Sequence, residues 1–241
     1  MIRALVVLSL LLAPLTARAA ECHAALVLAL DLSDSVDAHE ADLQRKGLAA
    51  ALRDDAVRAA IMPRPELGAA LMAFEWNNPS FQRVIAGWRL LSSPTAIDAF
   101  ADRLTAGPSA RVHGQTGIGA AMRYAVRSFA NAPPCTRKLI DISGDGPGNT
   151  GIPPTSVRKS GELANFTING LVIRNPALDS AQPPARDPSP YYQKNVKFGP
   201  GAFVIVIDSY DDCADAIRRK LLREITKPVV EAPRPRGRDT S

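Results

Sequence analysis

The chain has 241 residues, enough for one well-buried domain, and its 46% hydrophobic and 22% charged residues exclude a wholly disordered protein. The formal net charge is +5, but Arg3 and Arg18 belong to the first 19 residues and another basic run lies near the carboxyl terminus. A short basic run is typical of a solvated tail, so the charge indicates no nucleic-acid partner.

The first 19 residues have the form of a cleaved export signal. Arg3 precedes an apolar run over residues 4–13, and Ala17-Arg18-Ala19 has the small residues that signal peptidase accepts, which predicts cleavage after Ala19. The alternative is a membrane anchor, but this run is well short of the roughly 20 apolar residues that a spanning helix needs. We therefore expect a periplasmic or secreted protein with no transmembrane segment in its mature chain.

A buried strand and a long helix are predicted next. Residues 24–30 are continuously apolar, which is typical of a strand covered on both faces. Asp37 and Glu40 have the spacing of a capping box, so a helix is expected over residues 38–59. We expect its inner face to carry Leu43, Gly47, Ala50 and Ala51.

Strands and helices then alternate along the rest of the chain. Prolines mark residues 174–200 as a long loop excursion, and a flexible Pro/Arg tail is expected over 228–241. Strands are expected at 67–76, 81–88, 138–142, 167–173 and 202–207, and helices from Ser93 or Thr95 to 104 and at 118–129, 156–163 and 211–225. The alternation predicts an α/β domain over residues 22–227, with a doubly wound, mainly parallel sheet flanked by helices.

The three cysteines suit an oxidising compartment. Cys22 precedes the first expected strand and Cys135 precedes a later one. If these strands are parallel neighbours, both sulfurs start at the same sheet edge and could form a disulfide, with Cys213 as a buried spare. The alternative is three unpaired thiols.

Polar side chains follow two of the expected strands. Asp31, Ser33 and Ser35 alternate directly after the first strand, so their oxygens could converge on one point. Asp145 follows the later strand at the comparable place, and Thr116 precedes a helix on a third loop. Two facing carboxylates would repel each other, and a hard cation would remove that conflict. Each piece alone is a common helix cap or turn, so the prediction depends on the combination.

This pattern, Asp31-x-Ser33-x-Ser35 with Thr116 and with Asp145 before Gly146, resembles the metal-ion-dependent adhesion site of von Willebrand factor A domains. Several segments also resemble an uncharacterised secreted bacterial subgroup of that superfamily, a domain of unknown function. They are Phe74-Glu75-Trp76, Ile142-Ser143-Gly144-Asp145-Gly146, Ile168-Asn169-Gly170-Leu171, Tyr191-Tyr192 and Gly199-Pro200-Gly201-Ala202-Phe203.

The resemblance implies a six-stranded sheet of Rossmann-type topology with its first and fourth strands adjacent, as a Cys22–Cys135 disulfide requires. It also implies that Ser33, Ser35 and Thr116 contact Mg²⁺ through hydroxyls and that Asp31 and Asp145 bind through water. One position would stay open for a carboxylate of a partner protein. Ca²⁺ or Mn²⁺ are alternatives to Mg²⁺. Relatives often carry Gly where Asp34 stands, and we expect Asp34 to face solvent.

The sequence thus favours an exported, cation-dependent protein-binding module. A metal-assisted hydrolase is the alternative, but it needs a positioned general base, and the chain offers no candidate. Phosphate-loop and nucleophile-elbow motifs are absent, and Gly114-Gln115-Thr116-Gly117-Ile118-Gly119 does not follow a strand as a dinucleotide loop would. A purely structural metal site is the third hypothesis. We expect the aromatic residues Trp76, Trp88, Tyr191 and Tyr192 to pack in the core or loops, and His23, His39 and His113 to be surface or loop residues.

Overall fold

The structure, a computed structural model, describes residues 21–107, 112–174 and 187–226. The expected leader, 1–19, and the tail, 228–241, lie outside these ranges. In the described residues, β1 (Glu21–Asp31), β2 (Leu67–Trp76), β3 (Gln82–Leu91), β4 (Arg137–Gly144), β5 (Thr167–Ile173) and β6 (Val204–Ile207) form one sheet. The helices are α1 (Ala38–Arg53), α2 (Asp55–Ile61), α3 (Pro94–Thr105), α4 (Ile118–Ser128), α5 (Pro154–Lys159), α6 (Ser189–Tyr191) and α7 (Cys213–Thr226), with shorter turns at Phe129–Asn131, Tyr192–Val196 and Tyr210–Asp212.

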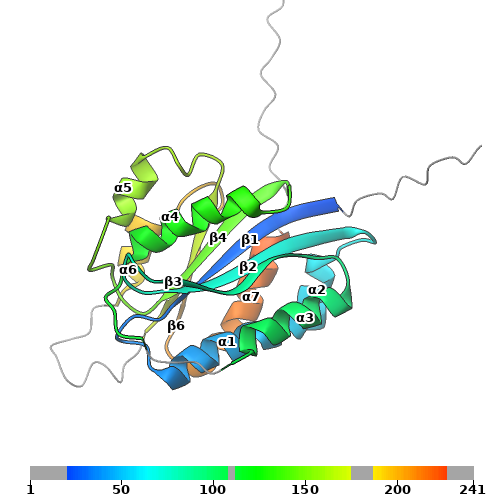
Figure 1. The fold of residues 1–241 in the computed structure, drawn as a ribbon, viewed down its shortest axis with the longest axis horizontal. Coiled ribbons are helices and arrows are strands. Elements are labelled where there is room, and N and C mark those ends of the chain that lie inside the picture. The colour runs from blue at the N-terminus through cyan, green and yellow to red at the C-terminus, as the bar shows by residue number, and fades with distance from the viewer. Residues whose placement is uncertain (1–20, 108–111, 175–186, 227–241) are drawn as a thin grey trace, which may run out of the picture.

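The sheet has the order β3-β2-β1-β4-β5-β6, so the first and fourth strands are neighbours as expected. Its strand pairs are parallel except for β2 with the edge strand β3. Helices α1, α2, α3 and α7 cover one face, and α4 and α5 cover the other (Figure 1). The predicted α/β fold with a doubly wound, mainly parallel sheet is therefore confirmed. The carboxyl ends of β1 and β4 lie at the same edge, where ligands bind in such sheets.

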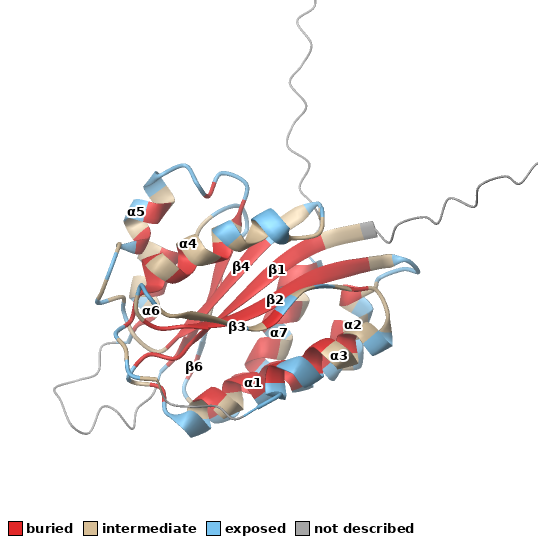
Figure 2. Ribbon diagram, viewed as in Figure 1, coloured by how far each residue is buried: buried red, intermediate tan, exposed pale blue. Residues whose placement is uncertain are grey.

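The central strands are buried on both faces, as their continuous apolar sequences predicted. The side chains of residues 24–30 are at most 7% exposed. Figure 2 shows this buried band running through the sheet, with exposed residues on the outer sides of the helices. Two apolar layers, one on each face, hold the sheet edge that carries the polar loops in a fixed position.

The single helix predicted over residues 38–59 is in fact two helices. The capping box of Asp37 and Glu40 starts α1 as expected. The chain then turns extended at Asp54, whose carboxylate accepts hydrogen bonds from the Ala56 and Val57 N–H groups and from Nε of Arg218 in α7. The break between α1 and α2 depends on this cap and on the contact with the distant helix α7. Neither interaction changes the spacing of apolar residues, so the sequence pattern did not show it.

The predicted inner face of that helix was partly wrong. Ala50 is exposed and Leu43 is only partly buried, whereas Ala51 lies in the core as predicted, together with Leu48 and Leu52. Gly47 is buried against α7, as predicted for the inner face, and a Cβ there would lie 3.1 Å from the Ala214 backbone nitrogen.

Two later predictions need correction. The helix expected over 156–163 is the shorter α5, which begins at Pro154 and ends at Lys159. Residues 174–200 were predicted as a long loop excursion, and 175–186 lie outside the described residues. The following segment is helical from Ser189 to Val196 and buries Tyr192 completely, so this part belongs to the core.

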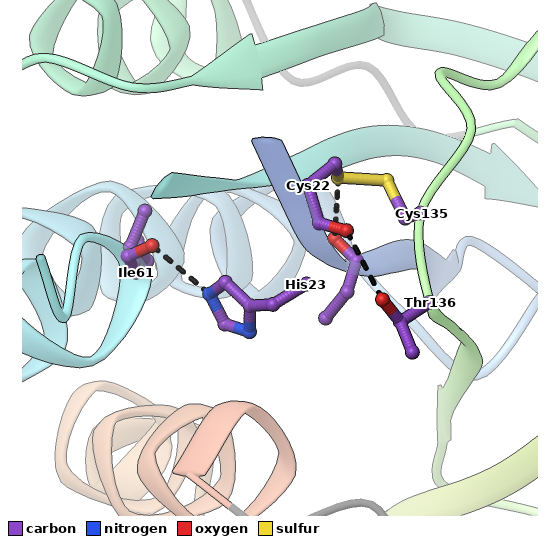
Figure 3. Close-up of a disulfide and its surroundings, with 6 residues drawn as sticks. Cys22, His23, Ile61, Cys135 and Thr136 are labelled. Carbon is purple, nitrogen blue, oxygen red and sulfur yellow. Dashed lines mark hydrogen bonds between the residues drawn. A yellow bond between two sulfur atoms is a disulfide. The ribbon is translucent and has the colours of Figure 1, made fainter. Parts of the chain in front are cut away.

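A disulfide joins Cys22 at the start of β1 to Cys135 just before β4 (Figure 3). The Thr136 N–H donates to the Cys22 carbonyl at 3.2 Å, so the two strand starts are also linked by their backbones. Cys213 is free and buried, as predicted. Among the described residues, no helix is long and apolar enough to cross a bilayer.

Candidate metal centre

Asp31, the last residue of β1, starts a tight turn beneath the candidate site. Its side chain is buried, and Oδ1 accepts the Ser33 N–H at 2.8 Å. This bond turns the chain so that the hydroxyls of Ser33 and Ser35 face each other, with their Oγ atoms 3.3 Å apart. The alternating polar residues therefore converge, as the sequence predicted.

Asp145 meets this turn from the neighbouring strand. It follows Gly144, the last residue of β4, and its Oδ1 accepts a hydrogen bond from Ser35 Oγ at 2.7 Å. Its Oδ2 accepts a longer bond, 3.4 Å, from the hydroxyl of Tyr210. Residues 110 positions apart in the chain thus share one short contact, which brings both acidic loops together.

Thr116 lies on a third loop that is tied to both of the others. Its N–H donates to Oδ1 of Asn149 at 2.9 Å, and the Asn149 N–H donates back to the Thr116 carbonyl at 3.0 Å. On the other side, the Asp34 N–H donates to the Gly114 carbonyl at 2.8 Å. Thr116 is 6% exposed and sits just before α4, so its backbone is held between the loops that carry the two aspartates.

The glycines beside Thr116 allow close packing against the turn between β2 and β3. A Cβ on Gly114 would lie 2.6 Å from the side chain of Asn77, and one on Gly117 would lie 2.7 Å from the Asn77 carbonyl. Asn77, in the turn between β2 and β3, also accepts the Gly117 N–H at 2.7 Å. Sequence reasoning singled out neither Asn77 nor Asn149 as a site residue, because neither contact is local.

The surroundings of the Asp31 and Asp145 carboxyl groups disfavour the ionisation of both groups at once. Burial raises the pKa of Asp31 well above its ordinary value, and the nearby Asp145 carboxylate raises it further. Burial also raises the pKa of Asp145, while the hydrogen bond from Ser35 acts in the opposite direction. A bound cation would favour the ionised form of both groups.

The second carboxylate oxygen of Asp31 is the next notable feature of the site. Oδ2 of Asp31 is inaccessible to solvent and has no hydrogen-bond partner among the described residues. An unsatisfied buried acceptor is costly, and such groups in native proteins call for a water, an ion or a functional role. The two hydroxyls and two carboxyls around it are hard oxygen donors of the kind that Mg²⁺ prefers, so these residues fit a divalent cation.

A second unsatisfied group lies next to Asp31. The hydroxyl of the fully buried Tyr192 also has no hydrogen-bond partner among the described residues. A Cβ on Gly144 would lie 2.3 Å from this hydroxyl and 2.7 Å from Asp31 Oδ2, so the two oxygens are close and only glycine fits between them. The sequence predicted packing for Tyr192, which is correct for its ring, but gave no signal for its hydroxyl.

Asp34, the departure from the family pattern, lies at the rim of the site. It is exposed, as expected, and its Oδ1 accepts the Gly114 N–H at 3.1 Å and lies 3.0 Å from Nδ1 of His113. His113 is 83% exposed, which agrees with the surface position predicted for it. Asp34 thus links the first and third loops.

Carboxylates and imidazoles alone do not form a metal site in residues 21–107, 112–174 and 187–226. No three His, Cys, Asp or Glu side chains gather there in an arrangement that could hold a metal ion. A cation bound by Asp31 and Asp145 would therefore depend on the serine and threonine hydroxyls for its remaining protein ligands.

Comparison with families finds one match over most of the chain. The family described as "Protein of unknown function (DUF1194)" matches residues 21–229. No curated protein matches the chain significantly in sequence.

Solved structures share the fold at low sequence identity. Proximal thread matrix protein 1 from the mussel byssus has a TM-score of 0.58 and 16% identity, over 84% of this chain and 47% of that one. The von Willebrand factor type A protein from Catenulispora acidiphila has a TM-score of 0.56 and 17% identity, over 87% of this chain and 44% of that one. The pilus adhesin SpaC from Lactobacillus rhamnosus GG has a TM-score of 0.58 and 12% identity, over 85% of this chain and 31% of that one.

A further structure of the mussel protein is described as having a zinc-occupied MIDAS motif, with a TM-score of 0.56 and 14% identity, over 84% of this chain and 48% of that one. The chain spans less than half of the length of each of these structures. At these identities the likeness establishes the von Willebrand factor A-like fold.

Proposed function

Because the chain belongs to the DUF1194 family of proteins of unknown function and has a von Willebrand factor A-like fold, we propose that it is an exported, divalent-cation-dependent protein-binding module. Asp31, Ser33, Ser35, Thr116 and Asp145 would hold the cation. An acidic residue of a partner protein would complete its coordination. The observation that carries this proposal is the junction of the two acidic loops through Ser35 and Asp145, beside the unsatisfied Oδ2 of Asp31.

The donor set favours Mg²⁺ as the ion. Hydroxyl and carboxylate oxygens are hard ligands, and Mg²⁺ keeps some of its waters when protein groups bind it, which leaves a position for an outside ligand. Ca²⁺ and Mn²⁺ prefer similar oxygens and are the alternatives. Zinc, named for the mussel protein, more often binds nitrogen and sulfur and is a useful comparison ion.

A partner carboxylate suits the coordination of such a centre. Mg²⁺ demands near-octahedral oxygen coordination, so the five protein side chains would leave a position that a hard carboxylate oxygen from outside could fill. The pilus adhesin with the same fold is consistent with a role in attachment. Export is supported by the leader-like residues 1–19 and by the disulfide, which is typical of oxidising compartments.

Melting experiments on the mature chain test the metal site. For a Kd of about 100 µM, 10 mM Mg²⁺ would stabilise the native state by about 2.7 kcal/mol, or about 5–10 °C in melting temperature for a domain of this size. Asp145→Asn should abolish the shift, since it removes one of the two charges. Asp42→Asn, at a surface ion pair with Lys46, is the matched control and should keep it. No shift with Mg²⁺, Ca²⁺ or Mn²⁺ would contradict the site.

Selection from a displayed random-peptide library tests the binding function separately. Peptides retained in Mg²⁺ should be enriched in Asp and Glu, should be released by EDTA, and should not bind the Asp145→Asn variant. A metal-dependent melting shift without any metal-dependent, acidic peptide would instead indicate a purely structural ion.

A further inference from the structure

A cavity of about 410 Å³ opens where β4 and β5 begin, at the sheet edge opposite the candidate metal centre. Its lining includes apolar, basic and acidic side chains: Leu139, Phe166, Phe203, Arg137, Lys138 and Glu224. Two segments that resemble the uncharacterised subgroup, 168–171 and 199–203, contribute to this lining, and the proposed metal centre uses neither of them. The volume lies in the range of small-molecule sites, which combine apolar walls with a few polar groups.

The wall formed by residues 199–203 is held in place by the protein itself. The Phe203 N–H donates to Oδ1 of Asn169 in β5 at 3.0 Å. Gly199 has a φ of +87°, and a Cβ there would lie 2.3 Å from the Phe166 carbonyl oxygen, so this turn packs directly on the residue before β5. A cavity with walls fixed in this way binds a ligand without the cost of ordering a loop.

Glu224 is the acidic side chain in the cavity lining, and its charge is opposed from within the protein. The side chain is 1% exposed, and its Oε1 accepts a hydrogen bond from Lys220 Nζ at 2.5 Å. Lys220 Nζ also lies 2.7 Å from Oδ1 of Asp141. Burial raises the pKa of Glu224 to about 7, so at a lower pH this buried group of one ammonium and two carboxyls is close to neutral.

Arg137 brings a cation to the cavity that has no ion-pair partner. Its guanidinium donates to the carbonyl oxygens of Glu224 and Ile225, at 2.8 and 2.6 Å, and is thereby held at the end of α7. The other N–H groups of this guanidinium have no acceptor among the described residues. Burial lowers the pKa of Arg137, while the Glu224 carboxylate opposes this effect. A charge that has lost part of its water is costly unless it is paired, so an anion beside Arg137 would be favourable.

Two further cations lie against the aromatic walls. Lys138 Nζ is 5.6 Å from the ring centre of Phe166, and Arg223 Cζ is 3.9 Å from the ring centre of Phe203. Both basic side chains are exposed, and neither forms an ion pair within the part of the chain that the structure describes. Successive residues of a strand point to opposite faces, so Arg137 and Lys138 flank the cavity from the two sides of β4.

We propose that this cavity binds a small aromatic carboxylate. Its ring packs against Phe166 and Phe203, and its carboxylate accepts hydrogen bonds from the N–H groups of Arg137 that have no other acceptor. Such charge-assisted hydrogen bonds between a guanidinium and a carboxylate are among the stronger ones in proteins. A cationic ligand fits poorly, because three basic groups surround the apolar walls. The site involves none of the five metal-centre residues and stands independently of the proposed function.

Calorimetric titration of the full chain with 3-phenylpropionate at pH 6 tests the proposal. At this pH the ligand is ionised and Glu224 is mostly protonated. The acid should bind about tenfold or more tightly than 3-phenylpropanamide, which has its shape without its charge. It should exceed acetate, which has the charge without the ring, by a similar factor.

Substitutions then locate the binding site. Arg137→Gln should lower the affinity for 3-phenylpropionate by about tenfold or more, because it removes the hydrogen-bonding cation. Lys138→Gln, which alters an exposed side chain, should lower it by about threefold. Lys46→Gln, at a surface ion pair with Asp42, removes the same charge elsewhere and is the matched control that should leave the affinity unchanged.

Equal binding of the acid and its amide would overturn the proposal, and so would equal binding of the acid and acetate. No binding of 3-phenylpropionate at millimolar concentrations, or an unchanged affinity in both cavity variants, would do the same. The comparison of acid with amide uses the unaltered chain, so it decides the question even if the Arg137 variant fails to fold.

Discussion

Tyr192→Phe should leave the protein as stable as before or make it more stable. The ring of Tyr192 is fully buried in the apolar layer below α4, and Phe keeps this packing. The hydroxyl has no hydrogen-bond partner among the described residues, and a buried group without a partner costs about 1–3 kcal/mol. Its removal should therefore raise the free energy of unfolding by about 1 kcal/mol.

Tyr210→Phe is the matched comparison, with the opposite sign expected. Tyr210 is nearly as buried, but its hydroxyl donates to Oδ2 of Asp145 at 3.4 Å. Loss of this long bond to a carboxylate should cost about 1 kcal/mol. The two variants should thus differ by about 2 kcal/mol, although each loses one oxygen atom.

Urea unfolding in EDTA, followed by circular dichroism, measures both variants without a contribution from bound cation. For a domain of this size, 1 kcal/mol corresponds to about 2–4 °C in melting temperature, so thermal scans provide a second reading. If Tyr192→Phe loses as much stability as Tyr210→Phe, the Tyr192 hydroxyl has a bonding partner, such as a buried water. The Tyr192 hydroxyl would then not be a buried group without a hydrogen bond next to Oδ2 of Asp31.

Three other predictions concern the rest of the chain. Gly119→Ala should lower the free energy of unfolding, measured in urea, by about 1–3 kcal/mol, because the new Cβ would lie 1.9 Å from the Ile152 carbonyl oxygen. This clash should outweigh the better helix propensity of Ala. An unchanged urea midpoint of unfolding would contradict the prediction. Burial raises the pKa of Glu224 to about 7 from an ordinary value near 4.5, so the unfolded chain releases this proton at a lower pH than the folded chain does. The free energy of unfolding should therefore fall by about 1–3 kcal/mol between pH 5 and pH 8. Glu224→Gln should flatten this pH dependence, and the same pH dependence in the variant and the unaltered chain would refute the prediction. Thiol titration of the denatured, unreduced protein should find one thiol, that of Cys213, and the Cys22→Ser variant should show two. The same variant should lose about 3–5 kcal/mol of stability, because the disulfide closes a loop of 113 residues.

The candidate site could largely be predicted because its chemistry follows local patterns. Asp31, Ser33 and Ser35 alternate after a buried strand, and Asp145 follows another, so parallel pairing of those strands was enough to bring them together. The Cys22–Cys135 pairing required the same adjacency. For Thr116, the structure establishes the meeting of its loop with the other two, and its role as a ligand stays a prediction.

The helix break at Asp54 could not be predicted in the same way. The apolar spacing of residues 38–59 continues through it, and the competing contacts are a cap and a bond from Arg218, 164 positions away. The helical segment that buries Tyr192 was missed for a related reason. Its prolines indicate a loop, while packing against the sheet decides the conformation of Tyr192 and Val196.

The sequence by itself determined the alternation of strands and helices and the candidate cation-binding residues, because strand period, helix caps and residue type act over a few positions. Only the tertiary structure decided that, among the described residues, neither the Tyr192 hydroxyl beside Asp31 nor Oε2 of the buried Glu224 has a hydrogen-bond partner. Whether a buried polar atom has a partner depends on every group that surrounds it, and those groups come from segments that meet only when the whole sheet is assembled.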